Sequence, residues 1–257
     1  MPAPENKLKQ ALAKGEMQIG LWLVTTNPLM SEIAASAGYD WCLIDGEHAP
    51  NDLPLILAQL QAMSGGTATP VVRVPVGQNW MLKQVLDIGI QTVMVPMVET
   101  AEQAEACVRA VRYPPDGVRG LAASMIRASD YNAITDYAAT ANDEICLIVQ
   151  VESATAIENI DAIAGVDGVD VVFIGPSDLS ADMGFTGKPE APEVKAAITH
   201  AVTRIKAAGK AAGIIGGGDY ADMRDLGVTF LGLSADVTLI AKAMRGLAKD
   251  TRERLEM

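Results

Sequence analysis

The sequence predicts a single α/β domain spanning residues 1–257 and folded as a (β/α)8 barrel, also called a TIM barrel. Eight short apolar runs, rich in Val, Ile and Leu, each precede a segment with a helix-like pattern. The runs are apolar on both faces, as expected of a parallel sheet covered by helices. Eight such units in 257 residues match the size of this barrel. An open doubly wound sheet is the alternative, and the lack of a second domain disfavours it.

The expected strands are QIGLWLV (18–24), WCLID (41–45), VVRV (71–74), TVMVPMV (92–98), ICLIVQV (145–151), DVVFIG (170–175), AGIIG (212–216) and FLGLS (230–234). The expected helices lie at 28–37, 51–62, 79–88, 100–111, 154–164, 191–208, 219–225 and 236–248. In the last helix, apolar residues such as Val237, Ile240 and Met244 fall on one face.

Two intervals between these elements have unusual features. Residues 99–144 exceed what a strand–helix unit needs, and such an excursion predicts a functional or oligomeric role. Residues 213–219 are rich in glycine and include Gly217 and Gly218. They predict a tight turn between the seventh strand and its helix, with a phosphate site as the weaker alternative.

Composition limits the classes of function. The net charge is −12 and no basic patch is visible, so we expect no nucleic-acid partner. No apolar run reaches membrane-spanning length, and the polar start MPAPENKLKQ does not resemble a signal peptide, so we expect a cytoplasmic protein. Cys42, Cys107 and Cys146 lack metal-site spacing, which predicts reduced core thiols, with a catalytic thiol as the alternative.

Polar residues gather at the C-terminal ends of the predicted strands, where barrels of this kind place their active sites. They are Asp45, Gly46, Glu47 and His48 after the second strand, Arg73 in the third, Gln150 and Glu152 at the end of the fifth, and Gly175, Pro176, Ser177 and Asp178 after the sixth. Because these ends meet at one rim of the barrel, we expect the side chains to converge there.

Glu152 and Asp178 are candidate metal ligands. Each follows an otherwise apolar strand, and the two strands are consecutive. Neighbouring strands lie roughly 5 Å apart, so both carboxylates can reach one ion. Two oxygen ligands with room for water suit Mg²⁺ or Mn²⁺, whereas no cluster of His and Cys points to zinc. For either acid alone, helix capping is the alternative.

Arg73, His48 and Gln150 are the other candidates that the residues themselves indicate. Arg73 interrupts an apolar run, and a buried guanidinium needs a partner, either a structural carboxylate or an anionic ligand such as an enolate. His48 lies among acids just past a strand, which favours acid–base catalysis over a surface role. Gln150 shares a strand face with Glu152, so it orients a ligand or completes an interior network.

Several motifs resemble those of the HpcH/HpaI aldolases, which are metal-dependent pyruvate aldolases. The motifs are LIDGEHAPND (43–52), PVVRVP (70–75), KQVLDIGIQTVMVPMVETAEQA (83–104), YPPDGVRG (113–120), VQVES (149–153) and FIGPSDLS (173–180). They occur in the family's order, and the resemblance runs from about residue 5 to about residue 250. Members of the family act on 4-hydroxy-2-oxoheptanedioate, 2-dehydro-3-deoxyglucarate and related keto acids.

The resemblance implies a role for each matching residue. Glu152 and Asp178 would bind a divalent ion, Mg²⁺, Mn²⁺ or Co²⁺. Arg73 would stabilise the enolate, and His48 would be the acid–base residue, with Asp87 raising its basicity. Asp45 would support His48, and the substrate would contact Gln150, Gly175, Pro176, Ser177 and Trp22. The family also implies a last helix that swaps between subunits of a homohexamer, although the helix could equally pack on its own barrel.

The expected reaction is the reversible cleavage of a 4-hydroxy-2-oxo acid to an aldehyde and pyruvate, or a close analogue such as hydroxypyruvate. No predicted strand contains lysine, which argues against an aldolase that forms an imine. Residues 121–142, with Arg127 and Tyr131 as candidates, would border the aldehyde pocket. Two other functions stay open, an acyl-CoA lyase of the malyl-CoA or citramalyl-CoA type and a non-catalytic barrel that binds organic acids.

Overall fold

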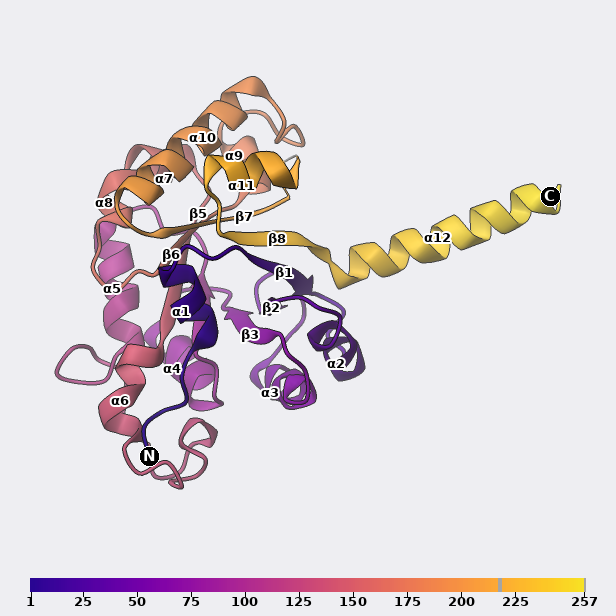
Figure 1. Cartoon of the computed structure of the whole chain (residues 1–257). Coiled ribbons are helices and arrows are strands. Elements are labelled where there is room, and N and C mark those ends of the chain that lie inside the picture. The colour runs from indigo at the N-terminus through magenta and orange to yellow at the C-terminus, as the bar shows by residue number, and fades with distance from the viewer. Residues whose placement is uncertain (217–218, 257) are drawn as a thin grey trace.

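The computed structural model describes residues 1–216 and 219–256. Eight parallel strands form a closed barrel in chain order, so the predicted (β/α)8 fold is confirmed (Figure 1). The strands are β1 (Gln18–Leu23), β2 (Trp41–Asp45), β3 (Thr69–Arg73), β4 (Thr92–Val95), β5 (Cys146–Val151), β6 (Val171–Ile174), β7 (Ala211–Ile215) and β8 (Phe230–Ala235). The predicted strand at 92–98 is too long, because the backbone turns at Met97, whose φ is 56°.

The helices that the sequence predicts occur close to their expected positions. They are α2 (Pro28–Ala35), α3 (Leu53–Met63), α4 (Asn79–Asp87), α5 (Ala101–Val111), α7 (Ala154–Glu158), α8 (Ile160–Ala164), α10 (Pro192–Ala207), α11 (Tyr220–Leu226) and α12 (Asp236–Arg254). The single helix expected at 154–164 is two short helices that meet at Asn159. Four elements were not predicted: α1 (Lys7–Ala13), the 3-10 turn η1 (Arg127–Ser129), α6 (Tyr137–Glu144) and α9 (Pro176–Asp182).

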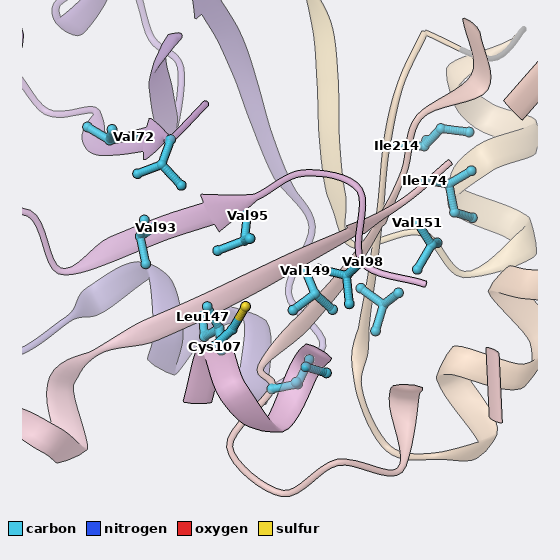
Figure 2. Packing of buried hydrophobic residues seen from close by; sticks show 14 of the residues in the cluster. Val72, Val93, Val95, Val98, Cys107, Leu147, Val149, Val151, Ile174 and Ile214 are labelled. Atoms are coloured by element: carbon cyan, nitrogen blue, oxygen red, sulfur yellow. The ribbon is translucent and has the colours of Figure 1, made fainter. Parts of the chain in front are cut away.

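Side-chain alternation along the strands builds two separate cores. One face of the strands packs against the helices, and Figure 2 shows part of this outer core, where Val93, Val95 and Leu147 lie near Cys107 of α5. The other face fills the barrel interior, where the ring of Trp41 stacks on Phe230 with centroids 4.0 Å apart. Gly20 makes room for that ring, since a Cβ there would lie 2.0 Å from it.

Helix α1 closes the N-terminal end of the barrel. Leu8 and Leu12 join the interior core, and Asn6 caps the helix by accepting a hydrogen bond from the backbone N–H of Lys9. The ammonium of Lys9 donates to the carbonyl oxygens of Asp143 and Ile145, at 2.9 and 2.7 Å. The helix therefore ties the start of the chain to the start of β5.

The long excursion between α5 and β5 packs at the same N-terminal end. Tyr113, Ile126, Tyr137 and Ala141 form a small core with Ala3. The backbone N–H of Ala3 also donates to Thr140 Oγ1 at 2.8 Å. Within one chain, the excursion thus lies at the end of the barrel opposite to the rim where the strands finish.

Helix α12 extends away from the barrel (Figure 1), and Asp236 at its start is its one buried residue among those described. Apolar side chains along it are exposed, including Met244 at 67% and Leu247 at 72%. Helix α11, which precedes β8, buries no residue. The alternative in which the last helix packs on its own barrel is therefore wrong for this structure.

No helix among the described residues has both the length and the apolar character that crossing a membrane requires.

Candidate active site

Strand alternation aims four polar side chains at the barrel axis near the C-terminal rim. In β2, Trp41 and Leu43 point inward, so Asp45 does too. In β3, Val71 points inward and is followed two residues later by Arg73. In β5 the same argument, starting from Ile148, places Gln150 and then Glu152 on the inner face. The list that follows from alternation is therefore Asp45, Arg73, Gln150 and Glu152, all buried.

Asp45 and Arg73 form the most tightly held pair in the site. They are register partners on β2 and β3, and two guanidinium nitrogens, Nε and Nη2, donate to the Asp45 carboxylate at 2.9 and 2.6 Å. The third nitrogen, Nη1, lies 2.9 Å from Glu47 Oε2 and 3.4 Å from Gln150 Oε1. Burial alone would lower the pKa of Arg73, but the bonds to Asp45 and the nearby carboxylates raise it, so the guanidinium keeps its charge.

Glu152 is held by two hydrogen bonds at the end of β5. Its Oε1 accepts from the backbone N–H of Met97 at 2.9 Å, and its Oε2 accepts from the amide of Gln150. Burial raises the pKa of this carboxyl group, the two hydrogen bonds oppose that shift, and the charges of Asp178 and Glu47 add to it. Three acids therefore share this part of the rim, and their mutual repulsion favours a bound cation.

The turn after β6 leaves space at Glu152. A Cβ on Gly175 would lie 2.5 Å from Glu152 Oε2 and 3.0 Å from Gln150 Nε2, so a larger residue there would force these two side chains to shift. Helix α9 begins directly afterwards at Pro176 and places Asp178 in its first turn. Within residues 1–216 and 219–256, no three His, Cys, Asp or Glu side chains form a ready metal cage. Two carboxylates suffice for an ion that keeps waters and takes further oxygens from its substrate.

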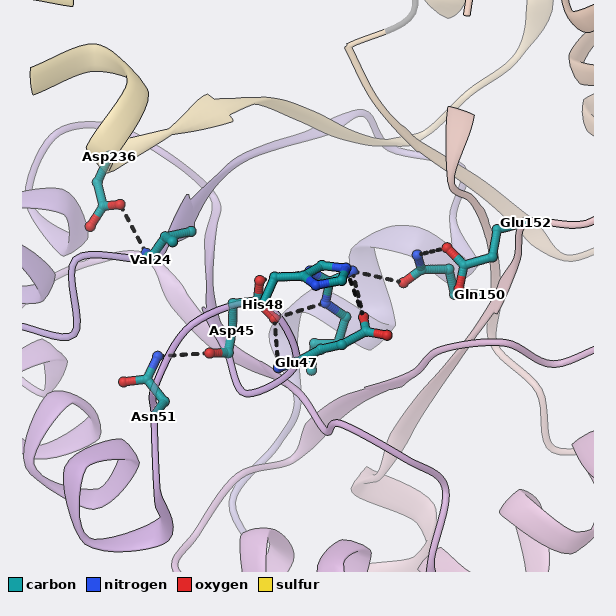
Figure 3. A network of polar contacts seen from close by, with 9 residues as sticks. Val24, Asp45, Glu47, His48, Asn51, Gln150, Glu152 and Asp236 are labelled. Carbon is teal, nitrogen blue, oxygen red and sulfur yellow. Dashed lines mark hydrogen bonds and ion pairs between the residues drawn. The ribbon is translucent and has the colours of Figure 1, made fainter. Parts of the chain in front are cut away.

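Figure 3 shows His48 beside Glu47. The imidazole is exposed over 64% of its surface, and its Nε2 lies 3.8 Å from Glu47 Oε2. Buried contacts hold the backbone of this turn, because Asn51 donates to the carbonyl of Asp45 at 2.7 Å and accepts from Gln59 at 2.7 Å. The sequence marks Glu47 only as one of several acids after the second strand and does not predict its contact with Arg73.

A pocket of about 370 Å³ opens at this rim of the barrel. Its lining combines the polar groups with an apolar wall, and the lining residues are Trp22, Asp45, His48, Arg73, Gln150, Phe173, Gly175, Pro176, Ser177, Asp178, Ile215 and Ala235. The structure thus brings the predicted substrate-binding positions to one cavity. No lysine is among these described lining residues.

Asp87 lies elsewhere in the chain. Helix α4 runs antiparallel to the strands, so its last residue, Asp87, lies near the start of β4, at the end opposite to His48. There its Oδ1 accepts from Arg119 Nη2 at 2.8 Å, and the Arg119 guanidinium lies 4.3 Å from the centre of the Tyr113 ring. One chain therefore does not bring Asp87 to its own His48.

The predicted aldehyde-pocket residues are also at that distant end. Arg127 donates to the carbonyl of Ile88 at 2.7 Å, and Tyr131 is 65% exposed; neither lines the pocket of its own chain. Gly217 and Gly218, expected in a tight turn, lie outside the described residues.

All three cysteines are buried and free, which confirms the prediction of core thiols. Burial raises the pKa of Cys42 to about 12 and that of Cys107 to about 11. It also raises the pKa of Cys146. A thiol that stays protonated is a poor nucleophile, so the alternative of a catalytic cysteine loses its support.

The model of the HpcH/HpaI aldolase/citrate lyase family matches residues 18–243. The chain belongs to this family. It is 52% identical over 250 residues to the hydroxypyruvate/pyruvate aldolase of Agrobacterium fabrum, covering 96% of this chain and 94% of that protein. It is 48% identical over 246 residues to a 4-hydroxy-2-oxo-heptane-1,7-dioate aldolase of Escherichia coli, covering 95% and 94%.

A solved family structure agrees with the fold. A HpcH/HpaI aldolase/citrate lyase family protein from Burkholderia cenocepacia superposes with a TM-score of 0.92 at 40% identity, covering 96% of this chain and 99% of that one. The matched region spans all eight strands, from the start of β1 to beyond β8. Membership therefore applies to the whole barrel and its C-terminal rim.

Proposed function

We propose that this HpcH/HpaI family member is a divalent-metal-dependent aldolase that cleaves 4-hydroxy-2-oxo acids to pyruvate, or hydroxypyruvate, and an aldehyde. The observation that carries the proposal is the placement of Arg73, fixed by Asp45, at a cavity that Asp178 also lines, with the Glu152 carboxylate held directly behind it by Gln150 of the same cavity. The relatives named as hydroxypyruvate/pyruvate aldolases support this substrate class.

Glu152 and Asp178 would hold the ion, for which Mg²⁺, Mn²⁺ and Co²⁺ are the candidates. The fit rests on two oxygen donors at one rim and on the space that Gly175 leaves beside Glu152. When bound, the ion supplies Lewis-acid polarisation of the keto group. The absence of lysine from the described pocket lining agrees with a reaction that forms no imine.

The chain's own residues divide the remaining work. Gln150 and the turn Gly175–Ser177 orient the keto acid, and Trp22 with Phe173 shields it from water on the apolar side. His48 takes the proton of the C4 hydroxyl as the C3–C4 bond breaks. The electron pair of that bond passes into the enolate of pyruvate, whose oxygen Arg73 stabilises. Delivery of that proton from His48 to C3 then gives pyruvate and restores the histidine, and the aldehyde leaves.

We further propose that the working protein is a homo-oligomer, a hexamer by family resemblance. The exposed apolar side chains of α12 and its projection away from the barrel support docking on a second copy (Figure 1). In such an assembly, Asp87 and the segment with Arg127 and Tyr131 would serve the rim of a neighbouring chain, since they lie far from their own. The swap of the last helix is part of this proposal.

The test is release of pyruvate from 4-hydroxy-2-oxo acids by metal-stripped protein, with and without Mn²⁺ or Mg²⁺. Release that depends on added metal supports the proposal. Folded protein that releases no pyruvate with any metal overturns it. Cleavage of malyl-CoA or citramalyl-CoA in the same assay would identify the acyl-CoA lyase instead, and pyruvate binding without turnover would identify an organic-acid-binding barrel.

A further inference from the structure

Every nitrogen of the Arg73 guanidinium already has a carboxylate or amide partner. Asp45 takes Nε and Nη2, while Glu47 and Gln150 lie at Nη1. In the proposed reaction, an oxygen of the keto acid must reach this guanidinium. The terminal nitrogens Nη1 and Nη2 each carry two N–H groups, so an oxygen that binds at Nη1 displaces Glu47 or Gln150 from it, or shares it with them.

Asp45 and Gln150 are poorly placed to move. Asp45 is 1% exposed, binds two nitrogens at once, and its Oδ1 also accepts the backbone N–H of Glu47 at 3.0 Å. Gln150 is 2% exposed, and its amide nitrogen is committed to Glu152. Displacing either one would leave a buried polar group without a partner, which is costly.

Glu47 differs from both. Its Oε2 lies 2.9 Å from Arg73 Nη1, yet it has no aligned hydrogen bond to any described residue. The contact is therefore an ion pair without the directional component that strengthens the Asp45 bonds. The side chain also keeps 17% of its surface exposed, so solvent gives it room to move.

Burial and neighbouring negative charges also make the charged form of Glu47 less favourable beside Arg73. Burial raises the pKa of Glu47, the Arg73 and His48 charges oppose that shift, and Asp45 and Asp178 add to it. A keto acid brings another negative charge to the same place. The nearest alternative partner is His48, whose Nε2 is 3.8 Å from Glu47 Oε2 (Figure 3).

We propose that Glu47 is a positioning residue that occupies Arg73 Nη1 in the ligand-free chain and moves to His48 when an oxygen of the keto acid takes that nitrogen. The exchange makes and breaks no covalent bond. It places a carboxylate against His48 at the moment when this histidine receives the hydroxyl proton. The inference rests on the proposed aldolase function for its catalytic consequence but not for the exchange itself.

The test separates binding from turnover. Oxalate, a dianion shaped like the enolate of pyruvate, is titrated into Mn²⁺-loaded wild type and Glu47→Gln by calorimetry, and retro-aldol kcat and KM are measured on the same proteins. Because Glu47→Gln no longer competes for Arg73, we expect oxalate to bind roughly three- to tenfold more tightly. We expect kcat to fall roughly tenfold or more, because His48 loses its carboxylate.

Two further variants sharpen the result. Glu47→Asp keeps the charge but is one methylene shorter, so it should also tighten oxalate binding while retaining more of kcat than Glu47→Gln. Glu105→Gln removes an exposed carboxylate on α5 and should leave both quantities unchanged. Melting temperatures of all variants confirm that each is folded.

Weaker oxalate binding in both Glu47 variants would overturn the exchange, because it would mean that Glu47 merely supports Arg73. Unchanged binding in both would overturn it as well. A wild type that releases no pyruvate would end the aldolase proposal, yet the oxalate comparison would still decide whether Glu47 and the ligand compete for Arg73.

Discussion

Asp45 and Arg73 face each other across β2 and β3 as register partners, and the carboxylate of one binds two nitrogens of the other. Both residues are buried, so water does not compete for the hydrogen bonds between them. This arrangement fixes the plane of the guanidinium before any ligand arrives, which is what stabilising a developing negative charge requires.

Replacing Asp45 should therefore damage both stability and activity. Asp45→Asn removes the charge that compensates a buried guanidinium, and we expect a loss of roughly 3 kcal/mol in the free energy of unfolding. We expect kcat to fall roughly a hundredfold or more, because Arg73 loses its fixed orientation. Denaturant unfolding and steady-state kinetics measure the two effects.

Asp225→Asn is the matched control for that prediction. Asp225 pairs with Arg224 at 2.7 Å, but both side chains are well exposed. Solvent screens such a pair, so its loss should change stability little. Equal destabilisation by the two variants would contradict the view that burial is what makes the Asp45 pair valuable.

The space beside Glu152 gives a second prediction. Gly175→Ala would push a methyl group against Glu152 Oε2, so we expect Mn²⁺ affinity to fall roughly ten- to hundredfold while the fold is kept. Calorimetric titration of Mn²⁺ measures the affinity. Gly65→Ala, where an added Cβ meets nothing within 4 Å, is the control and should bind Mn²⁺ like the wild type.

Strand periodicity made much of this site predictable. The alternation that buries Trp41 and Leu43 inward also carries Asp45 inward, and the same holds for Arg73, Gln150 and Glu152. The contact of Glu47 with Arg73 was not predictable in this way, because Glu47 lies in the turn beyond β2, where strand periodicity no longer determines which way a side chain points. The pairing of Asp87 with Arg119 was not predicted either, because the two residues are 32 positions apart and no local sequence pattern indicates such a contact.

Two of the helices that the sequence pattern does not predict share a cause. Helices α1 and α6 both pack at the N-terminal end of the barrel. A contact joins the two: the backbone N–H of Asn6, which precedes α1, donates to Glu144 Oε2 of α6 at 2.6 Å. Tertiary packing of this kind stabilises short helices whose own residue pattern is weak. Helix α9 has seven residues and begins inside a motif that was assigned to the active-site rim.

Two acids predict opposite dependences of stability on pH. Burial raises the pKa of Asp170, although Lys9 and the Leu147 N–H oppose the shift. Its charge therefore costs stability above the folded-state pKa, and the cost disappears as pH falls through that value towards the unfolded pKa. We expect Asp170→Asn to be more stable than the wild type at pH 7, and the difference to vanish in acid.

Asp161 supplies the opposite case. Its hydrogen bonds to Arg204 lower its pKa, so its contribution is present above the unfolded pKa and is lost as pH falls through the folded value. Asp161→Asn should be less stable at pH 7 and equal to the wild type in acid. Thermal melts of the wild type and the two variants across this pH range measure both changes in stability. If both variants were stabilised at pH 7, or both destabilised, the assignment of the two pKa shifts to burial and to hydrogen bonding would be refuted.

The exposed apolar face of α12 predicts an assembly that depends on it. In the double variant Met244→Asp and Leu247→Asp, two charges replace side chains that are 67% and 72% exposed in one chain. If these side chains are buried against a second copy, the variant should form smaller species by light scattering after size exclusion. Thr199→Asp on the exposed face of α10 is the control, and dissociation of that control as well would contradict a specific role for α12.

The separation of Asp87 from His48 gives the last prediction, a complementation between inactive chains. Asp87 ends α4 near the N-terminal end of the barrel, so it can assist a histidine only in a neighbouring copy. We expect His48→Ala and Asp87→Asn each to be nearly inactive as pure proteins. In a hybrid pair, one site receives both native residues and the other receives neither.

Unfolding and refolding an equal mixture of the two variants should therefore restore roughly a quarter of the wild-type activity if the shared unit is a dimer. Each variant refolded alone is the control for recovery. Hybrid oligomers that form, as mass measurements can establish, but stay inactive would assign Asp87 a different role. It would then be the counterion of Arg119, whose buried guanidinium needs a carboxylate whether or not any histidine does.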